Sequence, residues 1–159
     1  MKIAITSPHN LGDLLAKVPL IRLLKKEIAK GHITLLARSY ALNLIDYIPE
    51  CDEGLDFDQF FLREEEEILK DFKEYDMVIH LLSRERDLGP PVIHYAEKAG
   101  IPIRIGNIQR KGFIKKYFRK KGLTHNIGQK RILPNLHEFQ WNLFPLKALG
   151  YRHDYSMEE

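Results

Sequence analysis

The sequence has little cysteine and no long hydrophobic run. Its 159 residues include one cysteine, Cys51, so the chain can form no internal disulfide and offers no pair of thiols to a metal. No apolar run approaches the about 20 residues that cross a bilayer, so we expect no transmembrane helix. The first residues have the pattern of a strand and lack the parts of an export signal. We therefore expect the protein to remain in the cytoplasm.

The chain also lacks the common motifs for binding phosphate cofactors and metals. Its first loop has neither the three spaced glycines of a dinucleotide fingerprint nor the Gly-Lys-Ser/Thr of a P-loop. The seven histidines show no zinc-like spacing. Asp56-Phe57-Asp58 spells the Asp-x-Asp with which some sugar transferases hold a divalent ion, but acids are so dense in this region that the match has little weight. We predict no cofactor and no metal.

The length of the chain restricts its domain count. A chain of 159 residues has room for one domain with a proper core, which we place at 1–150. Residues 151–159 are then a C-terminal tail or the start of an interdomain linker. A hydrophobic fraction of 44% with 30% charged residues is typical of a globular protein.

The net charge of +3 hides a strong asymmetry. Residues 50–76 hold twelve acids and three bases, whereas residues 98–137 hold eleven bases and no acid. The basic stretch 104–131 favours a partner that carries phosphate, such as an anionic lipid, a lipopolysaccharide or a nucleic acid. A nucleic acid is the least favoured of these, because no RNA- or DNA-binding motif is present. The alternative is a solvated face that balances the acidic segment.

Apolar runs of strand length alternate with amphipathic segments of helix length, which predicts an α/β fold with a parallel sheet flanked by helices. We predict strands at 2–6, 33–37, 54–57, 76–82 and 101–105. We predict helices at 12–29, 40–47, 64–73, 91–98 and 137–149. Pro19 should bend the first helix, and Gly150 should end the last one. The stretch 106–135 is predicted to be a long, partly irregular excursion over the surface.

Asp13 is the candidate catalytic residue, because it follows the first strand at the head of an apolar helix. A helix N-terminus favours a negative charge, so this carboxylate could accept a proton from a substrate hydroxyl. The alternative is that Asp13 only caps its helix. Arg84 and Arg86 follow the fourth strand, which places them at the same edge of the sheet, where open α/β folds bind ligands. Their guanidinium groups suit phosphates and carboxylates, unless they are ordinary exposed arginines.

An ordered set of segments resembles the N-terminal half of the family nine glycosyltransferases, which are the lipopolysaccharide heptosyltransferases and their relatives. The matching segments are Leu11-Gly12-Asp13-Leu14-Leu15 with Pro19 and residues 22–25, then 33–38, 75–81, 99–106, and His137-Glu138 with residues 146–150. Together these segments span nearly the whole chain, although no single one is decisive.

The resemblance implies a GT-B architecture, in which two Rossmann-like domains face each other across a cleft. The N-terminal domain binds a lipopolysaccharide-core or similar anionic glycan acceptor, and the C-terminal domain binds a nucleotide sugar such as ADP-heptose. It implies that Asp13 deprotonates the acceptor hydroxyl in an inverting, metal-independent transfer. It also implies peripheral association with the inner face of the cytoplasmic membrane. The acceptor-binding residues that it suggests are Ser7, Asn10, Gly12, Arg84, Arg86, Arg104, Arg110 and Lys111.

Members of this family usually run to more than twice this length, so we expect the donor-binding C-terminal domain to be absent from this chain. We therefore expect an acceptor half that is inactive alone. The sequence leaves open whether it is an expressed fragment, a natural truncation or one half of a split enzyme. The face that would meet the donor domain would be uncovered in an isolated acceptor half, so a partner chain or a second copy of this chain, as a homo-oligomer, could bind there. The alternative function is a non-catalytic module that binds anionic lipid or glycan through residues 104–131.

Overall fold

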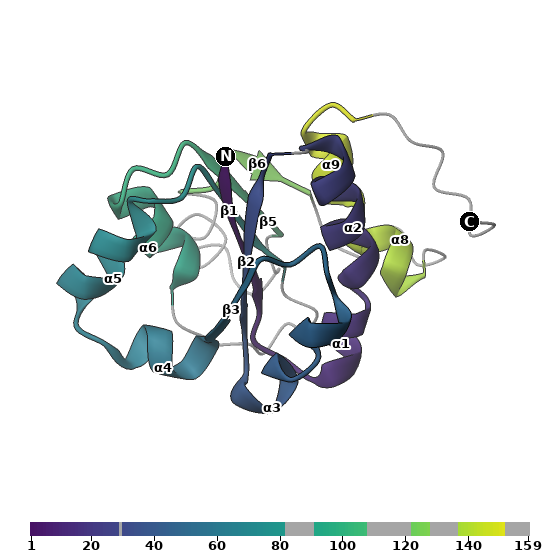
Figure 1. Ribbon diagram of the computed structural model, residues 1–159. Coiled ribbons are helices and arrows are strands. Elements are labelled where there is room, and N and C mark those ends of the chain that lie inside the picture. Colours follow the sequence, from purple (N-terminus) through teal and green to yellow (C-terminus); the bar gives the residue numbers. More distant parts are fainter. Residues whose placement is uncertain (29, 82–90, 108–121, 128–136, 152–159) are drawn as a thin grey trace, which may run out of the picture.

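The computed structural model describes residues 1–28, 30–81, 91–107, 122–127 and 137–151. Its described strands form one parallel sheet in the order β3-β2-β1-β4-β5-β6 (Figure 1). The strands are β1 Lys2–Ser7, β2 His32–Ala37, β3 Glu53–Asp56, β4 Met77–His80, β5 Ile103–Gly106 and β6 His125–Asn126. The predicted α/β fold is confirmed, and the strand order is that of a Rossmann-like domain.

Strand β1 lies at the centre of the sheet, hydrogen-bonded to β2 on one side and to β4 on the other. In register, Ile3 pairs with both Ile33 and Met77. Ile3 and Ile33 are fully buried and Met77 nearly so, because helices cover both faces of the sheet. This explains the continuous apolar runs in the sequence, which are typical of strands with no solvent-facing side.

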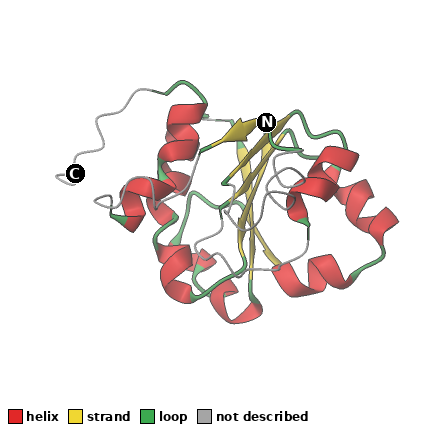
Figure 2. Ribbon diagram, turned by 180° about the vertical axis from the view of Figure 1, so that it is seen from behind, coloured by secondary structure: helices red, strands yellow, loops and turns green. Residues whose placement is uncertain are grey.

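The helices form two layers, one on each face of the sheet (Figure 2). One face is covered by α1 Leu11–Leu15, α2 Val18–Glu27, α3 Ser39–Leu42, α8 Glu138–Asn142 and α9 Phe144–Ala148. The opposite face is covered by α4 Phe57–Leu62, α5 Glu65–Phe72 and α6 Val92–Lys98. Trp141 and Leu146 are buried in the first layer, and Phe57 and Phe72 in the second. None of the described helices is long and apolar enough to cross a membrane.

The predicted helix at 12–29 is wrong in one respect, because the structure has two helices there instead of one bent helix. Pro19 stands in the first turn of α2, where its missing N–H is harmless, and the chain turns between α1 and α2. The predicted helix at 137–149 divides in the same way, with Pro145 in the first turn of α9. The segment predicted as a helix at 40–47 is the short α3 followed by a 3₁₀ turn, Ile45–Tyr47.

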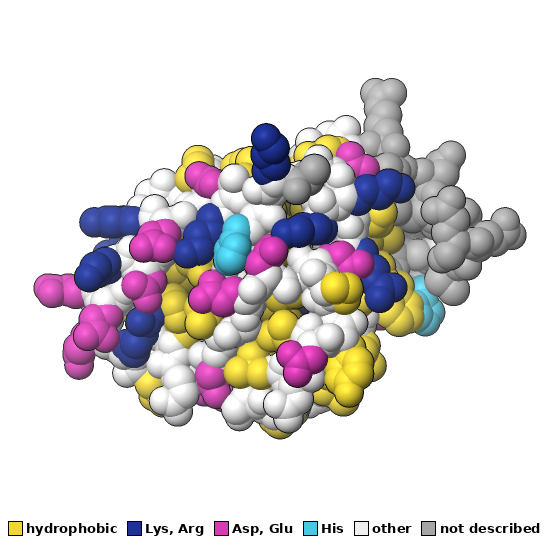
Figure 3. Space-filling view, in the orientation of Figure 1, with side chains coloured by type: hydrophobic (Ala, Val, Ile, Leu, Met, Phe, Trp, Pro, Cys, Tyr) yellow, Lys and Arg dark blue, Asp and Glu magenta, His cyan; other side chains and the backbone are white. Residues whose placement is uncertain are grey.

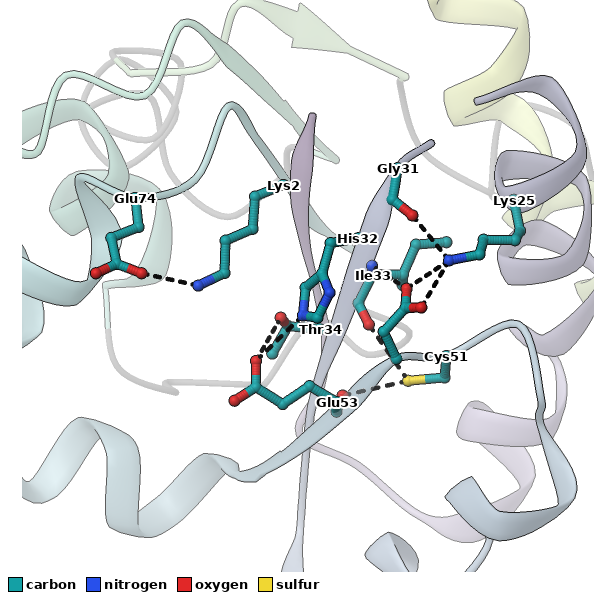
Figure 4. Close-up of polar contacts among 10 residues, drawn as sticks. Lys2, Lys25, Gly31, His32, Ile33, Thr34, Cys51, Glu53 and Glu74 are labelled. Atoms are coloured by element: carbon teal, nitrogen blue, oxygen red, sulfur yellow. Dashed lines mark hydrogen bonds and ion pairs between the residues drawn. The ribbon is translucent and has the colours of Figure 1, made fainter. Parts of the chain in front are cut away.

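Polar side chains tie α2 to the sheet at the amino ends of β2 and β3 (Figure 4). Lys25 Nζ donates to both carboxylate oxygens of Asp52 at 2.7 Å and to the carbonyl of Gly31 at 2.8 Å. The N–H of Ile33 donates to Asp52 Oδ2 at 2.7 Å. Partial burial opposes the charge of Asp52, but the bonds from Lys25 and Ile33 outweigh it and hold the pKa of Asp52 below its usual value. Asp52 therefore joins the start of β2 to the end of α2.

Replacing this carboxylate tests its contribution to folding. Asp52→Asn should lower the free energy of unfolding by about 1 kcal/mol at neutral pH, because it removes a charge-assisted, partly exposed pair. A depressed folded-state pKa gives stability that is present above the unfolded pKa and lost as pH falls through the folded one. The gap between wild type and variant should therefore close in acid, as urea unfolding would show. Asp46→Asn, an exposed position with no ion pair in the described structure, is the control, and a gap independent of pH would contradict this account.

Candidate functional site

The strand order reverses between β1 and β4. From β1 the chain proceeds outward to β2 and β3, whereas from β4 it proceeds outward to β5 and β6. In open parallel sheets, ligands bind outside the carboxyl ends of the strands at such a switch point. There the register pairs Thr6 with His80, and Thr6 Oγ1 lies 2.6 Å from His80 Nδ1 in the buried sheet. The switch point is the natural place to look for a site.

Asp13 lies at this edge, just after the end of β1. The extended backbone of Asn10 begins α1, and its N–H donates to Asp13 Oδ2 at 3.3 Å, while the Asp13 N–H donates to the Asn10 carbonyl at 3.0 Å. Asp13 thus does cap its helix, as the alternative interpretation held. Its side chain is half-buried, and Oδ1 accepts no hydrogen bond from the described residues. One oxygen is used for capping, and among the described residues none donates to the other, so it could take a proton.

The loop before Asp13 is fixed from the carboxyl end of β2. Arg38, directly after β2, donates from Nε to the carbonyl of Pro8 at 2.7 Å, and the Tyr40 hydroxyl donates to the carbonyl of His9 at 2.8 Å. The apolar side chains of Leu11 and Leu15 remain exposed beside it. Figure 3 shows apolar side chains gathered over α1 and α3, whereas charged side chains gather over α5 and α6. The surroundings of Asp13 are therefore held in place and partly apolar.

Lys17 is a site residue that the sequence analysis missed. Its side chain is 2% exposed, and Nζ donates to the Asp13 carbonyl at 3.2 Å and to Ser7 Oγ at 3.4 Å. Burial lowers the pKa of Lys17 to about 8, although the carboxylates of Asp13 and Glu138 act in the opposite direction. The signal was present, because Lys17 stands three residues after Leu14, among the apolar positions that face the core.

The structure brings together some of the predicted acceptor-binding residues. Ser7 is buried at the end of β1, Asn10 caps α1, and Gly12 is exposed in the first turn beside Asp13. The predictions for Arg84, Arg86, Arg110 and Lys111 lie outside the described residues, as does most of the basic stretch 104–131.

Arg104 does not join this group. It stands level with Val78 near the amino end of β5, and its guanidinium donates to the carbonyls of Ile101 and Gly122, which precede β5 and β6. This side chain stabilises the opposite edge of the sheet. Sequence alone does not show toward which end of a strand a long side chain extends.

The Asp-x-Asp motif has local partners in the structure. Asp56 is the N-cap of α4, and its Oδ1 accepts from the N–H of Gln59 at 3.0 Å. Asp58 Oδ2 lies 3.8 Å from Nη1 of Arg38. Within the described residues, no group of three or more His, Cys, Asp or Glu side chains could hold a metal.

Comparisons with known proteins give a likeness in structure only. No protein-family model and no curated protein sequence matches the chain. A family 9 glycosyltransferase of Veillonella parvula matches 98% of the chain with TM-score 0.66 and 23% identity. Heptosyltransferase WaaC of E. coli, solved with ADP, matches 99% with TM-score 0.65 and 13% identity. The E. coli ADP-heptose lipopolysaccharide heptosyltransferase II matches 82% with TM-score 0.60 and 22% identity.

The chain shares the fold of the matched part of these glycosyltransferases. It covers 42% of the Veillonella protein, 50% of WaaC and 36% of heptosyltransferase II, so it spans half of their length or less. The resemblance seen in the sequence is therefore confirmed at the level of the fold.

The buried ammonium of Lys17 should make stability depend on pH. Its folded-state pKa of about 8 lies below the ordinary 10.5, so the unfolded chain binds more protons between these values and stability rises with pH there. From about pH 7.5 to pH 9.5, the free energy of unfolding of wild type should rise by about 2 kcal/mol relative to Lys17→Met. Urea unfolding at both pH values measures this. Lys26→Met, on the exposed side of α2, should keep the wild-type slope, and equal slopes in all three proteins would contradict the account.

Proposed function

We propose that this chain is the acceptor-binding half of a glycosyltransferase of the heptosyltransferase type, in which Asp13 is the general base. The observation that carries the proposal is the half-buried carboxylate of Asp13 beside the switch point, with one oxygen open. The shared fold supports the reaction class, because the matched structures are glycosyltransferases. The proposed domain comprises residues 1–150, and the donor site lies in a second domain or chain.

In the proposed reaction, Oδ1 of Asp13 takes the proton of an acceptor hydroxyl. The acceptor oxygen then attacks the anomeric carbon of the nucleotide sugar, and the bond from that carbon to the nucleotide diphosphate breaks with inversion. The electron pair of the breaking bond leaves with the diphosphate. The capping bond from Asn10 to Oδ2 holds the carboxylate in one orientation while the proton moves. The reaction as proposed needs no metal.

The proposed acceptor is an anionic glycan of the lipopolysaccharide-core kind, and the proposed donor is ADP-heptose or a similar nucleotide sugar. WaaC was solved with ADP, which supports a nucleotide-sugar donor by analogy. Asn10 and Gly12 lie beside Asp13 and are the first candidates to contact the acceptor, and Ser7, buried at the end of β1, remains a proposal. Arg84, Arg86, Arg110 and Lys111 remain proposals for binding its anionic groups. The reaction would take place at the inner face of the cytoplasmic membrane, where such an acceptor is anchored.

Replacing Asp13 tests the proposal directly. The assay mixes this chain with a separately produced donor-binding domain of a heptosyltransferase, ADP-heptose and a heptose-deficient lipopolysaccharide acceptor. Asp13→Asn should lower transfer by about 10²- to 10⁴-fold, because it removes the proton acceptor and keeps the shape. Calorimetric titration of the acceptor against the chain alone should give nearly unchanged affinity for the variant. Asp46→Asn is the matched control.

Two results would overturn this proposal. Retained turnover in Asp13→Asn would remove the residue from the chemistry. Failure of the wild-type chain to bind the acceptor at all would show that it is not an acceptor half.

A further inference from the structure

We propose that Lys17 is a positioning residue, whose buried side chain fastens the turn that carries Asp13 to the end of β1. The inference rests on the proposed function, because it concerns how the proposed base is held. It assigns a role to a lysine that lies beneath the loop and does not reach the protein surface.

The break between α1 and α2 leaves the carbonyl of Asp13 without its usual helical partner. In a continuous helix that carbonyl would accept from the N–H of Lys17, four residues on. Here the Lys17 N–H donates to the Leu14 carbonyl at 2.8 Å instead. Lys17 Nζ donates to the Asp13 carbonyl at 3.2 Å. The side chain of Lys17 thus replaces its backbone N–H as the donor to this carbonyl.

The same ammonium reaches the sheet. Its Nζ also donates to Ser7 Oγ at 3.4 Å, and Ser7 is the last residue of β1, buried and in register with Ala37 of β2. Asp13 is therefore linked to the most constrained strand of the molecule through one side chain. Such a link restricts movement of the carboxylate relative to a substrate held at the edge of the sheet.

A lysine is a costly choice at this position. Leu14 and Ile21, three residues before it and four after it, are buried and apolar, and burial disfavours the charged form of Lys17. The charged groups that face it are the carboxylates of Asp13 on α1 and Glu138 on α8. An apolar residue would fill the same space without the loss of hydration. A buried charge kept at such a cost beside a candidate base is typical of a functional site.

Two measurements on Lys17→Met, a side chain of similar length with no donor, test the inference. The first uses the chain alone: amide hydrogen exchange at Asp13 and Leu14 should become about tenfold faster, while exchange at Ile5 in β1 does not become faster. The second uses the transfer assay: kcat should fall about 10- to 100-fold, with the acceptor KM within about threefold of wild type. Lys25→Met, which loses its bonds to Asp52 far from Asp13, should leave both readouts at wild-type values.

Each other outcome counts against the inference. Unchanged exchange shows that Lys17 does not hold the turn, and faster exchange with unchanged kcat shows a merely structural bond. If exchange is faster in Lys17→Met but the wild-type chain itself gives no transfer, the proposed function is overturned, and the positioning role with it. The hydrogen bond from Lys17 to the turn is still demonstrated in that case. If Lys17→Met does not fold, Lys17→Leu, which also removes the donor, undergoes the same two measurements with the same expectations.

Discussion

The site depends on the burial of β1, from Ile3 to Ser7, at the centre of the sheet. Its backbone is hydrogen-bonded to β2 on one side and to β4 on the other, and helices cover both of its faces. The position at which β1 ends is therefore fixed. The reversal of strand order beside β1 opens the sheet edge there. A residue in the first turn of the helix that follows β1 therefore acquires a defined position, and Asp13 is that residue.

Local backbone chemistry then decides how Asp13 is presented. The chain turns between α1 and α2, and α1 remains a short turn in which the N–H groups of Asp13 and Leu14 donate to the Asn10 carbonyl. A short turn is poorly held by its own hydrogen bonds, so additional bonds from Arg38, Tyr40 and Lys17 become important. The cost of burying the Lys17 ammonium is compatible with a site whose precision matters more than its stability.

The sequence predicted the sheet better than the site. A continuous apolar run such as the one in β1 is typical of a strand that helices cover on both faces. The pattern alone therefore predicted the parallel α/β fold. Helix α4 was missed because the predicted strand ran on to Phe57, whereas Asp56 is an N-cap that precedes Phe57 and Phe60 on the buried face. Lys17 was missed because a charged residue is normally exposed. The acceptor-binding role that the resemblance suggests for Arg104 stays a prediction, and a strand pattern does not show which sheet edge a long side chain serves.

The most direct test of the central claim is a structure of the chain with the glycan acceptor bound. The account predicts that an acceptor hydroxyl lies within hydrogen-bond distance, about 2.6–3.2 Å, of Oδ1 of Asp13 at the carboxyl edge of β1 and β4. An acceptor bound at another face of the sheet, with no hydroxyl near Asp13, would contradict it.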